Sequence, residues 1–226
     1  EAVQPQLLVQ HKLSKDAAYR AAYAGKLCAV SHRWEHPTAP DSAGSQLAAI
    51  VDYLLANEEG TLVWYDYWCM PQGERSAADT VLFKWMLGSV NMLYLGSTVL
   101  VQLDRSYLQR FWTQFEYILA NRFITADGFQ FSPERSSAVG IQSLKGSGAS
   151  QAQALSDKWA HVSTEDAVDM LGQPDVTVTN ESDKEGQLPK IKALDATVQG
   201  AFEAIAQGGT PAHPVVSIVD TEYLDH

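Results

Sequence analysis

The sequence has 226 residues, enough for one domain with a sizeable core, and it is 46% hydrophobic and 19% charged, which excludes a disordered chain. Its 27 acidic and 16 basic residues give a formal net charge of −11 without any run of Lys or Arg, so we expect no nucleic-acid binding. No apolar stretch reaches the roughly 18 residues of a membrane span, so we expect a cytoplasmic protein with no membrane partner. Cys28 and Cys69 have no metal-site spacing and are expected to be free thiols.

The first half of the chain alternates between short apolar runs and segments with apolar residues at helical spacing. Such alternation predicts an α/β fold with a parallel sheet and helices on both faces. The expected strands are Lys26–Ser31, Thr61–Tyr65 and Thr98–Leu103. The expected helices run from Ser45 to a stop at Gly60, through Val81 to Gly96, and over Gln109–Arg122.

The second half has more small and polar residues. Here we expect strands at Ser137–Leu144 and Asp175–Thr179, a flexible segment at Lys145–Ser150, and capping boxes at Ser163 with Asp166 and at Ser182 with Glu185. Pro189 suggests that the last helix starts later than its capping box. The expected organisation is a helical lead-in (1–25), one α/β domain (26–207, with its motifs in 26–122 and a divergent part in 123–207) and a loosely docked tail (208–226) with Pro211 and Pro214.

Two polar and aromatic loops follow the first two expected strands, and the carboxyl ends of parallel strands line the ligand crevice, so these loops should converge. The first is Ser31-His32-Arg33-Trp34, in which the Arg33 fork suits a phosphate or carboxylate. The second places Asp66 among aromatic side chains, suited to accepting hydrogen bonds from hydroxyls beside a flat ring. A surface loop and ordinary core aromatics are the alternatives. Cys69 has no neighbouring base that would make it a nucleophile.

The helix over Gln109–Arg122 carries a carboxylate at the edge of its apolar stripe. At 100° per residue, Glu116 lies just beyond Trp112 and should be half-buried, a setting that tunes a carboxylate. The alternative is a boundary glutamate paired with Arg110 or with a neighbouring Arg.

Three ordered motifs, SHRW, VWYDYWCMPQ with a following ER, and RFWTQFE, resemble the heterokaryon-incompatibility (HET) domain. More distantly they resemble TIR domains, whose tryptophan-cysteine-x-x-glutamate signature corresponds to Trp112 and Glu116. The chain departs from the HET pattern at His32, Arg33, Pro71 and Phe115. The resemblance implies a flavodoxin-like fold.

Enzymatic TIR relatives cleave NAD between nicotinamide and ribose with the helix glutamate, so the resemblance implies a NAD glycohydrolase in defence or cell-death signalling. It assigns catalysis to Glu116, with NAD as substrate and no cofactor or metal. Alternatives are a non-enzymatic signalling module that forms homo-oligomers, and an enzyme that processes nucleosides or nucleotides. The candidate substrate-binding residues are Ser31, His32, Arg33, Trp34, Asp66, Trp68, Cys69, Gln72 and Trp112.

Overall fold

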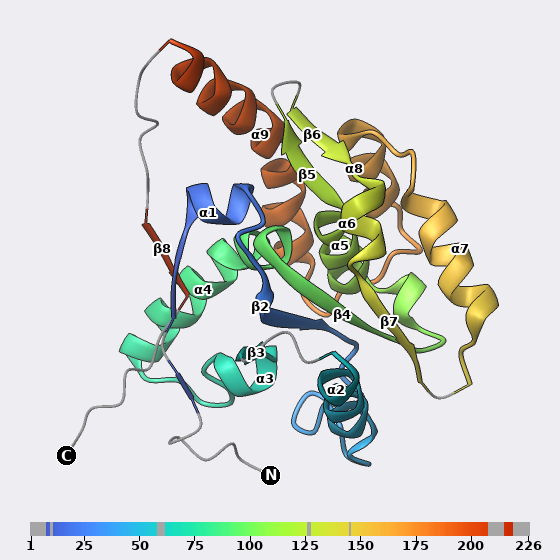
Figure 1. Ribbon diagram of the computed structural model, residues 1–226. Coiled ribbons are helices and arrows are strands. Elements are labelled where there is room, and N and C mark those ends of the chain that lie inside the picture. The colour runs from blue at the N-terminus through green and yellow to red at the C-terminus, as the bar shows by residue number, and fades with distance from the viewer. Residues whose placement is uncertain are drawn as a thin grey trace.

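The structure, a computed structural model, describes residues 8–9, 11–57, 62–125, 128–144, 146–207 and 215–218. The expectations at Gly60, Lys145, Pro211 and Pro214 lie outside these residues. The chain forms a four-stranded parallel sheet in the order β3-β2-β4-β7 (Figure 1). Its strands are β2 (Tyr23–Ser31), β3 (Leu62–Trp64), β4 (Ser97–Leu103) and β7 (Gly140–Ser143). The helices packed against it include α2 (Ser45–Ala56), α4 (Ala77–Gly96) and α5 (Phe111–Ala120).

Helices cover both faces of this sheet. On β2, Cys28 and Val30 point into a small core that they share with Ile50 of α2. Leu27 and Ala29 point the other way, into the larger core to which α4 and α5 contribute. Central strands that are apolar on both faces are typical of a covered parallel sheet. The expectation of an α/β fold with a parallel sheet between helical layers is confirmed.

The strand register brings the carboxyl ends of β2, β3 and β4 to one edge. Ala29 of β2 pairs with Trp64 of β3, and Ser31 pairs with Val101 of β4. Because successive residues of a strand alternate between faces, Ser31 lies on the same face as Ala29. This is the face covered by α5, the helix that carries Glu116.

Two antiparallel pairs lie outside the main sheet. β5 (Arg122–Thr125) and β6 (Gly128–Phe131) form a hairpin, and β1 (His11–Ser14) pairs with β8 (Val215–Ile218). Residues 215–218, which belong to the expected tail, thus contribute a strand to the fold. The other elements are α1 (Lys15–Tyr19), α3 (Asp66–Cys69), the short 3-10 helix η2 (Tyr107–Gln109), α6 (Pro133–Ser137), α7 (Ala149–Trp159), α8 (Thr164–Gly172) and α9 (Glu181–Ala206).

Several boundaries after α4 differ from the expectation. The helix expected to reach Arg122 ends at Ala120, because the Asn121 side chain donates a hydrogen bond to the Tyr117 carbonyl oxygen and closes it. The strand expected at Ser137–Leu144 is reduced to β7, since Ser137 belongs to α6. Residues 175–179 form no strand, only a single bridge between Thr177 and Arg110, the residue before α5. The loop Asp66–Gly73 begins with the single helical turn α3.

The expected caps of the last two helices have different outcomes. Half of the capping box expected at Ser163 is confirmed: its hydroxyl accepts a hydrogen bond from the Asp166 backbone N–H at 3.0 Å, whereas the Asp166 carboxylate bonds the Ser163 hydroxyl and not its backbone N–H. The box at Ser182 is wrong: α9 already begins at Glu181, and the Ser182 hydroxyl bonds the Asn180 side chain. Pro189 lies inside α9 rather than before it, because burial of the stripe outweighs one missing hydrogen bond. The buried members of that stripe are Ile191, Leu194 and Val198.

Candidate functional site

Ser31 and Glu116 meet at the carboxyl end of the central strand β2. The Ser31 hydroxyl donates a hydrogen bond of 2.6 Å to Oε2 of Glu116. Ser31 is fully buried, whereas Glu116 is partly buried. In the described residues Glu116 forms no ion pair, and Arg110 instead donates to the Thr179 hydroxyl. The reading of Glu116 as a boundary residue paired with Arg110 is therefore wrong.

Two tyrosines extend this contact into a chain of hydroxyl groups. The Tyr107 hydroxyl lies 2.6 Å from Ser31 Oγ, and it is the donor when Ser31 gives its proton to Glu116. Tyr107 is fully buried in η2, directly after β4. Tyr94, near the end of α4, has its hydroxyl within reach of the Glu116 carboxyl and donates to the Val30 carbonyl oxygen at 3.3 Å. Among the described residues, hydroxyl groups and not a cation therefore lie beside the Glu116 carboxyl.

These surroundings shift the protonation of Glu116. Burial raises the pKa of its carboxyl well above the ordinary value, and the nearby Asp66 charge raises it further. The hydrogen bonds from Ser31 and Tyr94 act in the opposite direction. A buried acid with a raised pKa, held by fixed donors, is the kind of group that performs proton transfer or charge stabilisation.

Asp66 is the centre of a second cluster, formed where the loops after β2 and β3 meet. Its carboxylate accepts hydrogen bonds from Trp34 Nε1 at 2.8 Å, from His32 Nε2 at 2.8 Å and from the Tyr67 backbone N–H at 2.6 Å. The Asp66 side chain is 29% exposed, whereas that of His32 is 2% exposed. The carboxylate therefore faces solvent on one side while its donors are held in place.

Aromatic packing fixes the orientation of His32. Its ring stacks on Tyr65 at a centroid distance of 4.1 Å, and Trp68 packs on Tyr65 at 4.3 Å. Nε2 bonds Asp66, and the buried Nδ1 has no hydrogen-bond partner among the described residues. The Asp66 bond therefore favours the tautomer with the proton on Nε2.

Arg33 and Gln72 support the loops. Arg33 Nε donates to Asp104 at 2.6 Å, and its Nη1 donates to the Trp34 carbonyl oxygen at 2.9 Å. Gln72 Nε2 donates to the Asp66 carbonyl oxygen at 3.2 Å. The guanidinium is thus already bound on one side, and it remains about a quarter exposed.

Three candidate residues pack mainly as apolar groups. Trp112 contacts Phe111 and Phe115 edge to face, and Trp68 packs on Tyr65. Burial raises the pKa of the Cys69 thiol to about 11, so the thiolate that a nucleophile requires is disfavoured. In the described part of the chain no group of three His, Cys, Asp or Glu side chains could hold a metal ion. No described helix is long and apolar enough to span a bilayer.

Sequence reasoning missed Asp104, Tyr107 and Tyr94. Asp104 and Tyr107 follow β4, and the loops at the carboxyl ends of parallel strands line the ligand crevice. The reasoning applied to the loops after β2 and β3 therefore holds for these two residues as well. Tyr94 lies within the continuous apolar end of α4, and nothing in the pattern distinguishes it from a core residue. The hydroxyl groups around Glu116 thus come from three elements that are distant in sequence.

Fold and site together define an α/β protein with two neighbouring carboxyl groups, Glu116 and Asp66, at the carboxyl edge of its parallel sheet. Comparison of the chain with protein-family models, curated proteins and solved structures found no match.

Proposed function

We propose that this edge of the sheet is an active site that hydrolyses the bond between nicotinamide and ribose in NAD, in a flavodoxin-like domain of the TIR and HET type. The observation that carries the proposal is the 2.6 Å hydrogen bond from Ser31 to the partly buried carboxyl of Glu116. It fixes one acid at the end of the central strand, where ligands of parallel sheets bind. The resemblance of the three motifs supports the choice of substrate.

The chemistry needs a fixed negative charge beside the ribose. When the glycosidic bond breaks, its electron pair leaves with neutral nicotinamide, and positive charge develops on the ribose carbon. Ionised Glu116 stabilises that charge, and a water molecule then adds to the carbon and loses a proton. The Ser31 donor keeps the carboxylate in position without neutralising it.

The neighbouring loops suit the rest of a dinucleotide. Trp34 offers an indole held by Asp66, on which a base could stack. The free side of the Arg33 guanidinium suits a pyrophosphate, and the exposed side of Asp66 suits a ribose hydroxyl.

The direct test is nicotinamide release from NAD by the purified chain, assayed at several protein concentrations because assembly could be required. Product at any concentration supports the proposal. Cleavage of deoxynucleosides with NAD left intact would instead favour the nucleoside-processing alternative, and no cleavage of either substrate would contradict an enzymatic role.

Removal of the Ser31 hydroxyl is expected to move the acidic limb of the pH–rate profile. Ser31 donates to the ionised form of Glu116 and lowers its pKa, so Ser31→Ala raises that pKa further. The carboxylate then forms only at higher pH, and the acidic limb of kcat/KM shifts upward. Thr113→Ser, which keeps a hydroxyl on α5 away from Glu116, is the control. An unchanged limb would show that Glu116 does not limit the reaction.

An apolar stripe on α2 favours self-association as a second function. Leu47, Val51 and Leu55 recur every fourth residue and are 45%, 45% and 77% exposed. Exposed apolar faces of this kind mark interaction surfaces. We expect Leu55→Asp to reduce concentration-dependent assembly in light scattering, whereas Ala78→Asp, at an exposed position in the first turn of α4, leaves it unchanged. Equal assembly of both variants would argue against this face.

A further inference from the structure

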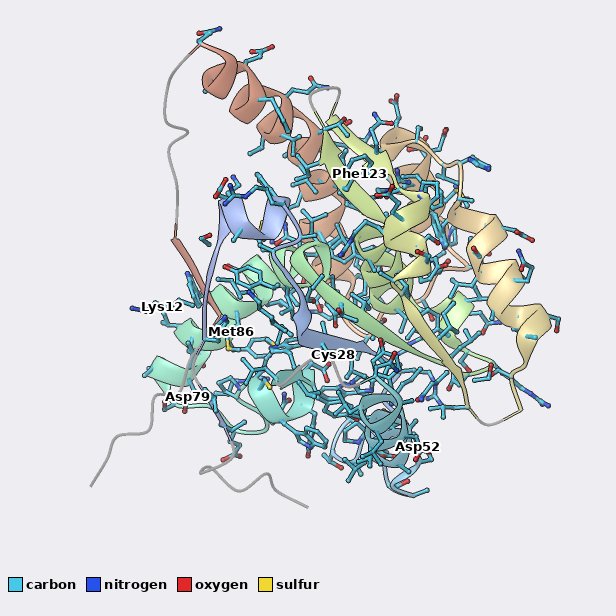
Figure 2. The ribbon with its side chains drawn as sticks, viewed as in Figure 1. Lys12, Cys28, Asp52, Asp79, Met86 and Phe123 are labelled. Atoms are coloured by element: carbon cyan, nitrogen blue, oxygen red, sulfur yellow. The ribbon has the colours of Figure 1, made fainter. Side chains whose placement is uncertain are left out.

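A large cavity lies at the opposite edge of the sheet from Glu116. It has a volume of about 810 Å³ and is bounded by α1, β5, α6 and α9. Ala24, at the start of β2, lines it, whereas Ser31 at the end of β2 belongs to the Glu116 site. Ser31 lies seven positions after Ala24 along the strand, a distance of roughly 20 Å. In Figure 1 the bounding elements gather in the upper part of the view, and Figure 2 shows Phe123 there on β5.

The walls of this cavity are largely apolar. Tyr19, Phe123, Ile124 and Phe202 line it together with several alanines. Phe123 remains 41% exposed, so part of its ring is free to gain from contact with an apolar ligand. The volume lies within the range of small-molecule sites, which are mostly apolar with a few polar groups.

Two cations at this cavity have no carboxylate partner. Arg20 is paired with Asp16, but neither Lys15 nor Arg135 forms an ion pair with any described residue. Arg135 binds only carbonyl oxygens at the end of α4, including that of Leu95 at 3.0 Å. Burial lowers the pKa of both Lys15 and Arg135. They contact neutral groups, the Tyr19 ring for Lys15 and backbone carbonyl oxygens for Arg135, so their charge carries a cost of burial. An anion would remove this cost.

Two polar atoms among the same residues are also unsatisfied. The hydroxyl of Tyr19 and Nε of Arg135 are buried and have no hydrogen-bond partner among the described residues. Burial raises the pKa of Tyr19 to about 12, so its hydroxyl keeps its proton and can donate. The Lys15 ammonium and the Arg135 guanidinium thus bring two positive charges to one cavity, which is complementary to a ligand with negative charge.

We infer that this cavity binds a small amphiphile, an apolar body that carries a single carboxylate. The apolar walls take the body, and Lys15 and Arg135 attract the carboxylate. Asp16 and Glu134 also line the cavity and disfavour ligands with several negative charges. The inference is independent of the chemistry proposed for Glu116, because no residue is shared between the two sites.

Titration calorimetry with 4-phenylbutyrate, 4-phenylbutanol and 4-phenylbutylamine tests the inference. The three probes share one apolar body and differ in charge. We expect the carboxylate to bind most tightly and the amine most weakly. Lys15→Met should weaken carboxylate binding about tenfold and leave the alcohol unchanged. Tighter binding of the amine, or no effect of Lys15→Met, would overturn the inference.

A matched pair of glycine variants locates the binding. Gly200 lines the cavity, and a Cβ at this position meets no atom within 4 Å, so Gly200→Leu fills space without a backbone clash. Gly186 lies on the same helix away from the cavity and is equally unobstructed. We expect Gly200→Leu to abolish binding of the carboxylate and Gly186→Leu to preserve it. Retained binding in Gly200→Leu would place the ligand elsewhere, and unchanged NAD hydrolysis in this variant would keep the two sites distinct.

Discussion

Glu116→Gln is expected to lower nicotinamide release at least a hundredfold while making the protein more stable at neutral pH. The loss of rate follows from removing the negative charge beside the ribose, an effect of about 3–4 kcal/mol. Glutamine has nearly the same shape and can still accept the hydrogen bond from Ser31, so the site should remain folded. Turnover close to that of the wild type would remove Glu116 from the mechanism.

The gain in stability has a defined pH dependence. Burial raises the pKa of Glu116 in the folded state, so the folded protein holds a proton that the unfolded chain releases. This penalty is absent below the ordinary pKa of glutamate and grows as the pH rises towards the raised value. We therefore expect equal stabilities of wild type and variant near pH 4, and a more stable variant at pH 8. Urea unfolding at both values measures the difference, and a less stable variant at pH 8 would contradict the burial argument.

Asp66→Ala is expected to destabilise the fold by about 2–4 kcal/mol, because it leaves several donors without an acceptor. The indole N–H of Trp34, Nε2 of His32 and the backbone N–H of Tyr67 all bind this carboxylate. The His32 ring is almost completely buried and cannot turn to water instead. Asp52→Ala removes an exposed acid from α2 and serves as the control in the same urea titration.

Asp66→Ala should also shift the pH–rate profile, in the direction opposite to Ser31→Ala. The charge of Asp66 raises the pKa of Glu116, so its removal lowers that pKa. The acidic limb of the pH–rate profile should then move to lower pH, whereas Ser31→Ala moves it to higher pH. Shifts in the same direction for both variants would show that the substitutions act by disturbing the structure of the loops and not through the charge of Asp66.

Much of the sheet and part of the candidate site could be predicted from the sequence. Apolar runs and helical spacing placed β2, β4 and α4 within a few residues, because both faces of these strands are buried and the helix pattern is long. The meeting of Trp34 with Asp66 followed from strand order alone. The half-buried position of Glu116 followed from the helical stripe.

The rest depended on tertiary contacts. The bond between Ser31 and Glu116 joins residues 85 positions apart, and no local pattern encodes it. The sequence places Glu116 next to Trp112 on the helix surface, but the Trp112 ring packs on phenylalanines and the hydrogen-bond donor to Glu116 is Ser31. The helix α9 tolerates Pro189 because its apolar stripe is buried against the core. Helix propensities describe the local chain and do not include such tertiary burial.

The ladder between β1 and β8 has a practical consequence for shortened versions of the protein. His11 lies opposite Ile218, so strands near the two extremes of the described chain satisfy each other's backbone groups. Trimming one of them leaves the other with an open row of amides and carbonyls, ready to recruit a foreign strand. Truncation should therefore delete both strands or retain both.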